Sequence, residues 1–322
     1  MPLLPFASLW DDAPNKIKIA ILKHAPLDTL KSLLPLHELK PLARQALIER
    51  VNDIMELFHL RPQVVLEMME STGTDLSGSA ALQVVSPSLS WKPSDLDFYC
   101  GFNDVQDVVY CFAGESYEVS MTFDAPYACK KFYTYAPASA RPANFEARFC
   151  ANFCIEKVYT LVHQERKLTI NIIQSRSPAS AAPLAFFHST LVMNMVSANG
   201  VVCAYPDLTL NLKAVDKYQQ RGYSFVQGDD HDITVDGDER VRSWRDPWSS
   251  RMRFRSGAKV IQGANAILSW RTSFRQYFNW GIREHAPEVL VEEDQRLVCY
   301  RNWVGPAHLA MSSHPSRARS VA

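Results

Sequence analysis

Two short segments carry residues that together suit chemistry on a nucleoside triphosphate. The first is a turn of small residues, Ser77, Gly78 and Ser79, followed by an apolar stretch that predicts a short helix. Backbone N–H groups and a hydroxyl at such a helix start can approach phosphate oxygens closely. The second is a stretch of alternating polar and apolar residues that predicts a strand with Asp95 and Asp97 on one face. Paired carboxylates of this kind can hold Mg²⁺ through oxygen ligands.

Each feature also has a plainer interpretation. Turns that contain serine and glycine are common in proteins of every function. A pair such as Asp95 and Asp97 is also compatible with an ordinary strand face turned towards solvent. What favours a site is the order of the two features along the chain: small turn, short helix, then paired carboxylates.

In this order the two segments resemble the nucleotidyltransferase fold, also called the polymerase-beta-like fold. Its signature is a Gly-Ser turn, a short helix and a strand that bears Asp-x-Asp. The resemblance implies that Asp95 and Asp97 are catalytic and hold Mg²⁺ or Mn²⁺, while Ser77, Gly78 and Ser79 bind the phosphates of a nucleotide. Fifteen residues separate Ser79 from Asp95, which is slightly long for the family.

The resemblance also implies a third metal ligand on a later strand. The segment 168–173 looks like that strand, and the position of the third carboxylate is taken by Asn171. An amide oxygen can coordinate a metal ion but carries no charge. Asn171 is therefore expected as the third ligand, in a site with one negative charge fewer than in an active member of the family.

At a narrower level the chain resembles a group of proteins from mushroom-forming fungi. These proteins pair an F-box-like helical segment with a nucleotidyltransferase-like domain. The segments that carry the resemblance are 42–47, 72–82, 95–99, 187–194 and 203–210. The resemblance covers roughly residues 1–225 and implies no settled activity. The F-box match omits the distal tryptophan-bearing part of that motif.

The elements around the site predict an α+β fold. Apolar residues at helical spacing predict a helical F-box-like segment over residues 1–60, packed on the later domain. The nucleotidyltransferase-like core, a mixed sheet with flanking helices, is expected over 61–225. A mixed extension with a disordered tail is expected over 226–322. Within the core we expect strands at 117–123, 155–162 and 168–173, and a helix at about 184–199.

Composition excludes several classes of protein. The chain has 322 residues, of which 47% are hydrophobic, and Lys+Arg equal Asp+Glu at 34 each. Zero net charge gives no global field that would attract nucleic acid or an anionic membrane. Seven cysteines without a CxxC pair disfavour a zinc ribbon or a disulfide scaffold. We expect no membrane segment and an intracellular location, cytoplasmic or nuclear, with reduced thiols.

A local exception to the neutral charge lies between residues 240 and 255, where six arginines alternate with aromatic residues. Such a segment can clamp phosphates or stack on bases. An acidic run at 229–239 lies just upstream, and a self-paired hairpin of opposite charges is the favoured interpretation. Nucleic-acid binding through this segment is a further hypothesis that is not favoured.

Two functions of different classes remain open from the sequence. The first is a divergent nucleotidyltransferase-fold protein that binds a nucleotide with Mg²⁺ and transfers a nucleotidyl group to an unknown acceptor. The second is a catalytically inactive adaptor. In that case residues 1–60 would dock on a ubiquitin-ligase scaffold protein, and the domain would recognise a partner.

Overall fold

The computed structural model describes most of the chain up to residue 262 and short segments beyond it. The described residues are 10–87, 91–124, 154–186, 192–210, 213–214, 224–225, 241–262, 265, 269–271, 288–293 and 296–301. The tail expected to be disordered and the acidic run at 229–239 lie outside these residues.

Helices form the first part of the described chain, as the sequence predicts. They are α2 (Asn15–Leu22), α3 (Leu27–Ser32), α4 (Leu39–Leu57) and α5 (Pro62–Thr72). Pro62 occupies the first turn of α5, where its missing N–H costs nothing. Gly73 ends the helix in the left-handed conformation, with φ of 65°.

An eight-stranded mixed sheet comes next, in the spatial order β11-β7-β6-β1-β2-β5-β4-β3. Its strands are β1 (Asp75–Ser77), β2 (Asp95–Cys100), β3 (Tyr117–Asp124), β4 (Ile155–His163), β5 (Thr169–Ser175), β6 (Asn194–Ser197), β7 (Gly200–Cys203) and β11 (Ser250–Arg253). Helix α6 (Gly78–Val85) begins directly after β1, and α7 (Val105–Ala113) lies between β2 and β3. This combination of helices and a mixed sheet confirms the α+β class.

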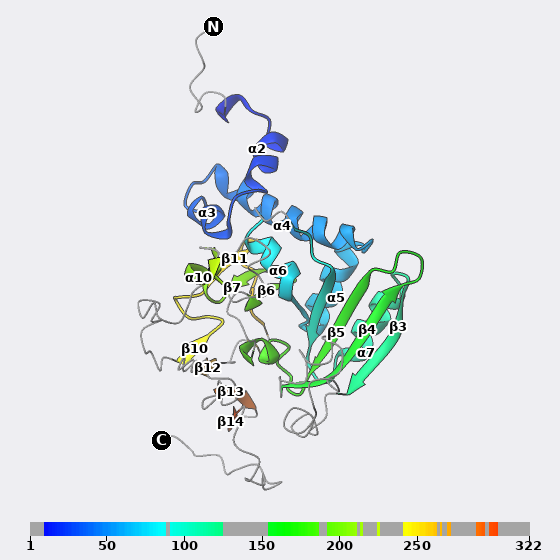
Figure 1. Ribbon diagram of the computed structural model, residues 1–322. Coiled ribbons are helices and arrows are strands. Elements are labelled where there is room, and N and C mark those ends of the chain that lie inside the picture. Colours follow the sequence, from blue (N-terminus) through cyan, green and yellow to red (C-terminus); the bar gives the residue numbers. More distant parts are fainter. Residues whose placement is uncertain are drawn as a thin grey trace.

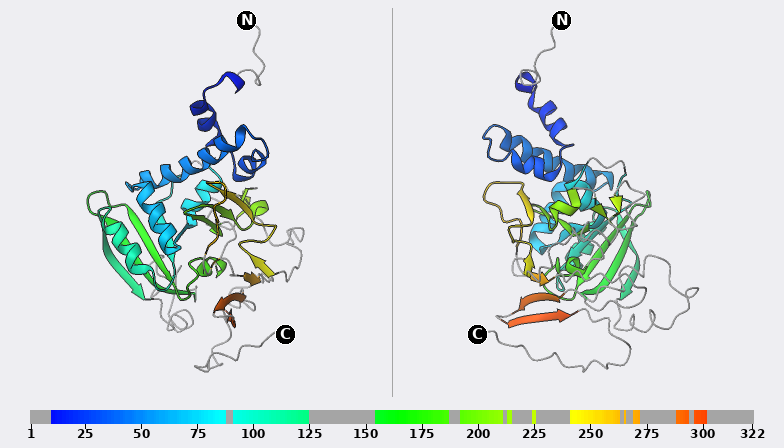
Figure 2. Two further views of the ribbon diagram at one scale, coloured as in Figure 1. Left: turned by 180° about the vertical axis from the view of Figure 1, so that it is seen from behind. Right: turned by 60° about the vertical axis from the view of Figure 1, so that its left-hand side comes forward.

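Helices cover one face of the sheet (Figures 1 and 2). Leu76, Phe98 and Ile172, one from each of three neighbouring strands, pack in one cluster with buried residues of α2 to α7. The N-terminal helices thus share their core with the sheet. On the opposite face a second cluster joins Tyr99 and Val202 to Trp244 and to the segment around residues 179–185.

Arg50 ties three of the helices together from inside the protein. Its guanidinium donates to Val84 O at the end of α6 (3.0 Å) and to Leu22 O at the end of α2 (2.7 Å), and it also bonds Ala25 O. Carbonyls at helix ends lack a partner in the next turn of the helix, so this buried cation supplies them with hydrogen bonds. Burial lowers the pKa of Arg50 to about 10.

The segment after β5 differs from the prediction. In place of a helix over 184–199, a short 3₁₀ helix spans Ala182–Phe186, and β6 and β7 form a hairpin. Ala198 and Asn199 form the hairpin turn, and Gly200 is the first residue of β7. A Cβ at Gly200 would come within 2.4 Å of Met252 O, so the close approach of β11 requires glycine at this position.

The remaining elements are short. They are helix α10 (Pro206–Leu210), the pair β8 (Lys213–Ala214) and β9 (Ser224–Phe225), and a second sheet in the order β10-β12-β13-β14. That sheet contains β10 (Val241–Ser243), β12 (Ser269–Arg271), β13 (Glu288–Glu293) and β14 (Arg296–Arg301). In the described part of the chain, no helix combines the length and the apolar character needed to cross a membrane.

Candidate functional site

The turn between β1 and α6 is shaped by Gly78. Its φ of 69° is a left-handed conformation that residues with a Cβ rarely adopt. A Cβ built on Gly78 would lie 2.8 Å from Asp97 Oδ2. Ser79 follows in the first turn of α6 and is half-buried. The backbone thus passes directly beside the carboxylate of Asp97 as the helix begins.

The side chain of Ser77 lies inside the sheet. Its side chain is fully buried, and its hydroxyl donates to Asn194 O on β6 at 2.6 Å. The hydroxyl therefore ties β1 to β6 inside the sheet. The groups of this turn that could still donate to a phosphate are the hydroxyl of Ser79 and the backbone N–H groups, including that of Gly78.

The paired carboxylates lie at the junction of β1, β2 and β5. Asp97 is opposite Ser77 in the antiparallel pair of β1 and β2, and it is level with Asn171 in the parallel pair of β2 and β5. Asp95 and Asp97 alternate with the buried Leu96 and Phe98, so both side chains leave the sheet on the face opposite the helices.

The side chain of Asn171 bridges the two carboxylates. Its Nδ2 donates to Asp97 Oδ1 at 2.8 Å and to Asp95 Oδ2 at 3.3 Å. Asn171 is fully buried, and its Oδ1 accepts a bond of 3.1 Å from the hydroxyl of Thr160 on β4. All four side chains of this cluster therefore belong to one network across β2, β5 and β4.

The donor set suits a hard cation. Asp95 and Asp97 both face one point, the amide nitrogen of Asn171, which donates a hydrogen bond to each carboxylate. Carboxylate and amide oxygens are the ligands that Mg²⁺ takes in proteins, usually with water and substrate phosphates completing the shell. Within the described residues, no group of three or more His, Cys, Asp or Glu side chains could hold a metal ion. A cation at Asp95 and Asp97 would thus need ligands from elsewhere.

The structure brings together most of the residues that the sequence singled out. Gly78, Asp95, Asp97 and Asn171 lie in one cluster, with Ser79 beside it. Thr160 was missed, because a lone threonine on an apolar strand gives no signal in the sequence. Its position became visible only through the register of β4 and β5, which pairs Thr160 with Asn171.

A polar pocket lies apart from these carboxylates. It has a volume of about 260 Å³ and is lined by residues near the end of α5 and by Pro178, Ser180, Gln262 and Asn265. Behind it Asp75 accepts bonds of 2.7 Å from Ser180 Oγ and from Asn265 Nδ2. Burial raises the pKa of Asp75 to about 7, although both of these bonds lower it.

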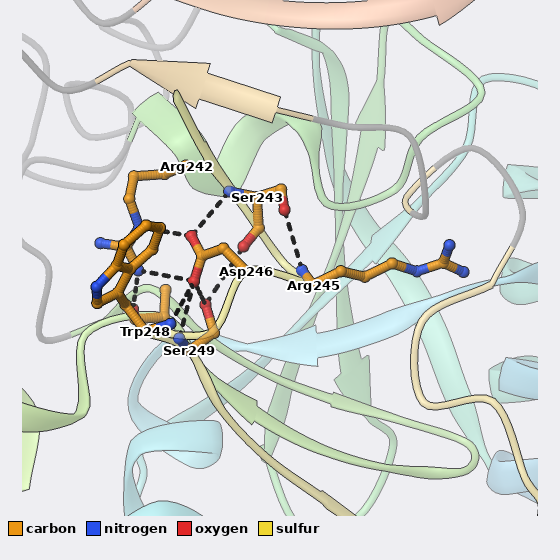
Figure 3. A network of polar contacts seen from close by, with 7 residues as sticks. Arg242, Ser243, Arg245, Asp246, Trp248 and Ser249 are labelled. Carbon is orange, nitrogen blue, oxygen red and sulfur yellow. Dashed lines mark hydrogen bonds and ion pairs between the residues drawn. The ribbon is translucent and has the colours of Figure 1, made fainter. Parts of the chain in front are cut away.

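The arginine segment is organised around Asp246, as Figure 3 shows. Asp246 accepts from the Nε of Arg242 at 2.6 Å and from three backbone N–H groups of the turn 243–249. Arg242 also lies over the ring of Tyr205, 4.4 Å from its centroid. Burial acts to raise the pKa of Asp246, but the bonds from Arg242 and the backbone outweigh burial and lower it.

One arginine of this segment has an acidic partner close by in the sequence. Arg242 pairs with Asp246, a residue of the arginine segment itself. The acidic residues that we expected to neutralise the segment lie outside the described part of the chain.

Comparisons with family models, with curated proteins and with solved structures found no match to this chain.

Proposed function

We propose that this protein binds a nucleoside triphosphate together with Mg²⁺ at the junction of β1, α6 and β2, and that it transfers the nucleotidyl group to an acceptor. The bond between the α- and β-phosphates would break in this step, and pyrophosphate would leave. The observation that carries the proposal is the convergence of Asp95 and Asp97 on one point directly beside the turn at Gly78. A phosphate chain at that turn would lie within reach of both carboxylates and of the first N–H groups of α6.

The turn supplies the phosphate contacts. The positive φ of Gly78 lets the backbone pass close to Asp97 and start α6 there. The free N–H groups of the first turn and the hydroxyl of Ser79 would donate to β- and γ-phosphate oxygens. The positive end of the helix dipole favours the same anion.

Asp95 and Asp97 would hold the metal ion. When bound, Mg²⁺ neutralises the charge that builds up on the phosphate oxygens and orients the phosphates for an in-line attack. Without it, the carboxylates and the triphosphate would repel one another. The site would therefore take up nucleotide and cation together, since neither completes the arrangement alone.

Asn171 would adjust to the cation by turning its amide. Its Nδ2 now faces the carboxylates and its Oδ1 faces Thr160. A hydroxyl can either donate or accept, so Thr160 can bond either end of the amide. The turned amide would present Oδ1 as the third ligand while its NH₂ donates to Thr160.

The proposal is tested by thermal unfolding with each nucleoside triphosphate, with and without Mg²⁺ or Mn²⁺. A ligand at about 100 times its Kd adds about 2.7 kcal/mol to the free energy of unfolding. We expect this shift only with both nucleotide and metal, and not in Asp97→Asn. Asp107→Asn, which removes an exposed carboxylate from α7, is the control. A wild-type protein that no nucleotide stabilises with either metal would disprove the proposal.

One observation favours the adaptor as a second candidate. Ile17 and Ile21, one turn apart on α2, are each 50% exposed, so the N-terminal helices present apolar side chains to solvent. Leu30, in contrast, is fully buried and belongs to the shared core. The test is binding of a purified ubiquitin-ligase scaffold subunit, which Ile17→Ser with Ile21→Ser should abolish without lowering Tm. No binding by the wild type would exclude this candidate.

A further inference from the structure

A group of arginines occupies the outer edge of the main sheet. Strand β11 is the last strand of the eight, beside β7. Its Met252 packs into the core under the helices, so Arg251 and Arg253 point to the opposite face. Arg253 is exposed and Arg251 is partly exposed. Neither of them makes an ion pair with another described residue.

A third arginine lies close to this pair. Arg245 is exposed, and one of its guanidinium nitrogens donates to Ile261 O at 3.2 Å. In Figure 3 its side chain extends away from the Asp246 network. Burial lowers the pKa of Arg251, and the charges of Arg253 and Arg245 lower it further. Like charges are thus held close enough to repel one another.

Among the described residues, the one acidic group that shifts the pKa of Arg251 is already paired. Asp246 raises the pKa of Arg251, but its carboxylate is buried and bonded to Arg242 and to the turn. Arg242 and Asp246 balance each other. Arg245, Arg251 and Arg253 remain as an excess of positive charge, which we call the arginine edge.

The register places the arginine edge on the same sheet face as the carboxylate site. Asp97 pairs with Ser77. The pair of Leu76 and Val196 sets Ser77 level with Met195 on β6, and Val202 pairs with both Met195 and Arg251. Because directly opposed residues of antiparallel strands share a face, one row runs from Asp97 to Arg251. Its ends are four strand spacings apart, about 19 Å.

We propose that the arginine edge binds the phosphate backbone of a nucleic-acid strand. Two arginines at alternate positions of a strand lie about 7 Å apart and form a row that suits regularly repeated anions. The guanidinium group matches phosphate with two parallel hydrogen bonds. Anionic membranes instead attract larger clusters of Lys and Arg. That the bound strand is also the acceptor of the nucleotidyl group rests on the proposed function.

The test measures fluorescence anisotropy of a labelled single-stranded RNA and of a DNA of the same sequence at several salt concentrations. We expect binding that weakens with salt, and at least a tenfold loss of affinity in Arg251→Gln with Arg253→Gln. The slope of log affinity against log salt should fall by about one unit for each lost contact.

The matched control is Arg166→Gln with Lys167→Gln, which removes the same charge from the exposed turn between β4 and β5. It should leave binding unchanged. Binding is measured without nucleotide or Mg²⁺, so this inference can hold or fail independently of the proposed function. If both double variants lost the same affinity for the oligonucleotide, the effect would come from net charge alone, and the inference would be overturned. So would the absence of binding at low salt, or tighter binding to phosphatidylserine vesicles or polyglutamate than to the oligonucleotides.

Discussion

Gly78 and Asp97 are in such close contact that no other residue fits at position 78 without moving the carboxylate. A Cβ there would lie 2.8 Å from Asp97 Oδ2, and the φ of 69° is itself unfavourable for residues other than glycine. The start of α6 and the position of one carboxylate are therefore set by the same residue. A change at Gly78 acts on both.

Gly78→Ala should lower the free energy of unfolding by about 1–3 kcal/mol and abolish nucleotide-dependent stabilisation. The loss of stability follows from the strained φ, and the loss of the nucleotide response follows from the displaced carboxylate of Asp97. Both are measured by urea unfolding with and without nucleotide and Mg²⁺.

Gly73→Ala is the matched control for this change. Gly73 has a φ of 65°, but nothing lies within 4 Å of a Cβ built there. This variant should lose similar stability and keep the response to nucleotide. If both variants respond to nucleotide like the wild type, the contact with Asp97 plays no part in binding.

Asn171→Asp should make the protein depend on a divalent cation for its stability. The variant loses the bonds from Nδ2 to Asp95 and Asp97 and places a third carboxylate beside them. Each lost bond to a charged group costs about 1.5–3 kcal/mol, and the added repulsion increases the loss. We expect Mg²⁺ to restore stability in this variant and to bind it more tightly than the wild type by calorimetry. Asn171→Asp that unfolds equally with and without Mg²⁺ would show that the carboxylates do not hold the ion.

The parts of this site that were predictable are those with local signals. Alternation within β2 was enough to place Asp95 and Asp97 on one face. The pairing of Asn171 with Asp97 was available only through the resemblance to a known fold, because it depends on strands more than 70 residues apart. Thr160 and the bonds of Ser77 depend on the same long-range register.

The helix expected at 184–199 failed for a physical reason. Short apolar runs fit a buried helix and a buried strand equally well, so periodicity could not decide between them. Asn-Gly also favours a tight turn over a helix end, and here Asn199 lies in the turn that joins β6 to β7, while Gly200 begins β7. β7 also pairs with β11, so a neighbouring strand lies along each of its edges. No local sequence pattern indicates this pairing.

Arg50→Gln should destabilise the packing of α2 and α6 on α4 by about 2–4 kcal/mol. The carbonyls of Val84, Leu22 and Ala25 would lose a charged donor in a place that water does not reach. Chemical unfolding measures the loss, with Glu56→Gln on the exposed side of α4 as the control. If Arg50→Gln unfolds at the same urea concentration as Glu56→Gln, water or other donors satisfy these carbonyls.

Asp75 should make stability fall as the pH rises towards neutrality. Burial raises its pKa from 3.8 to about 7 in the folded protein. Between these values the folded state binds a proton that the unfolded state has released, so the free energy of unfolding decreases with increasing pH. Above about pH 7 both states are ionised, and this contribution becomes constant.

Asp75→Asn should remove that dependence. The amide oxygen can still accept from Ser180 and Asn265, which now donate to Asp75 Oδ2 at 2.7 Å. One pKa unit corresponds to about 1.4 kcal/mol, so from pH 5 to pH 8 the variant should gain about 3 kcal/mol relative to the wild type. Urea unfolding at both pH values measures this gain, and Asp107→Asn, an exposed carboxylate, should show none of it. A wild type and an Asp75→Asn variant with parallel pH profiles would mean that Asp75 stays ionised when the protein folds.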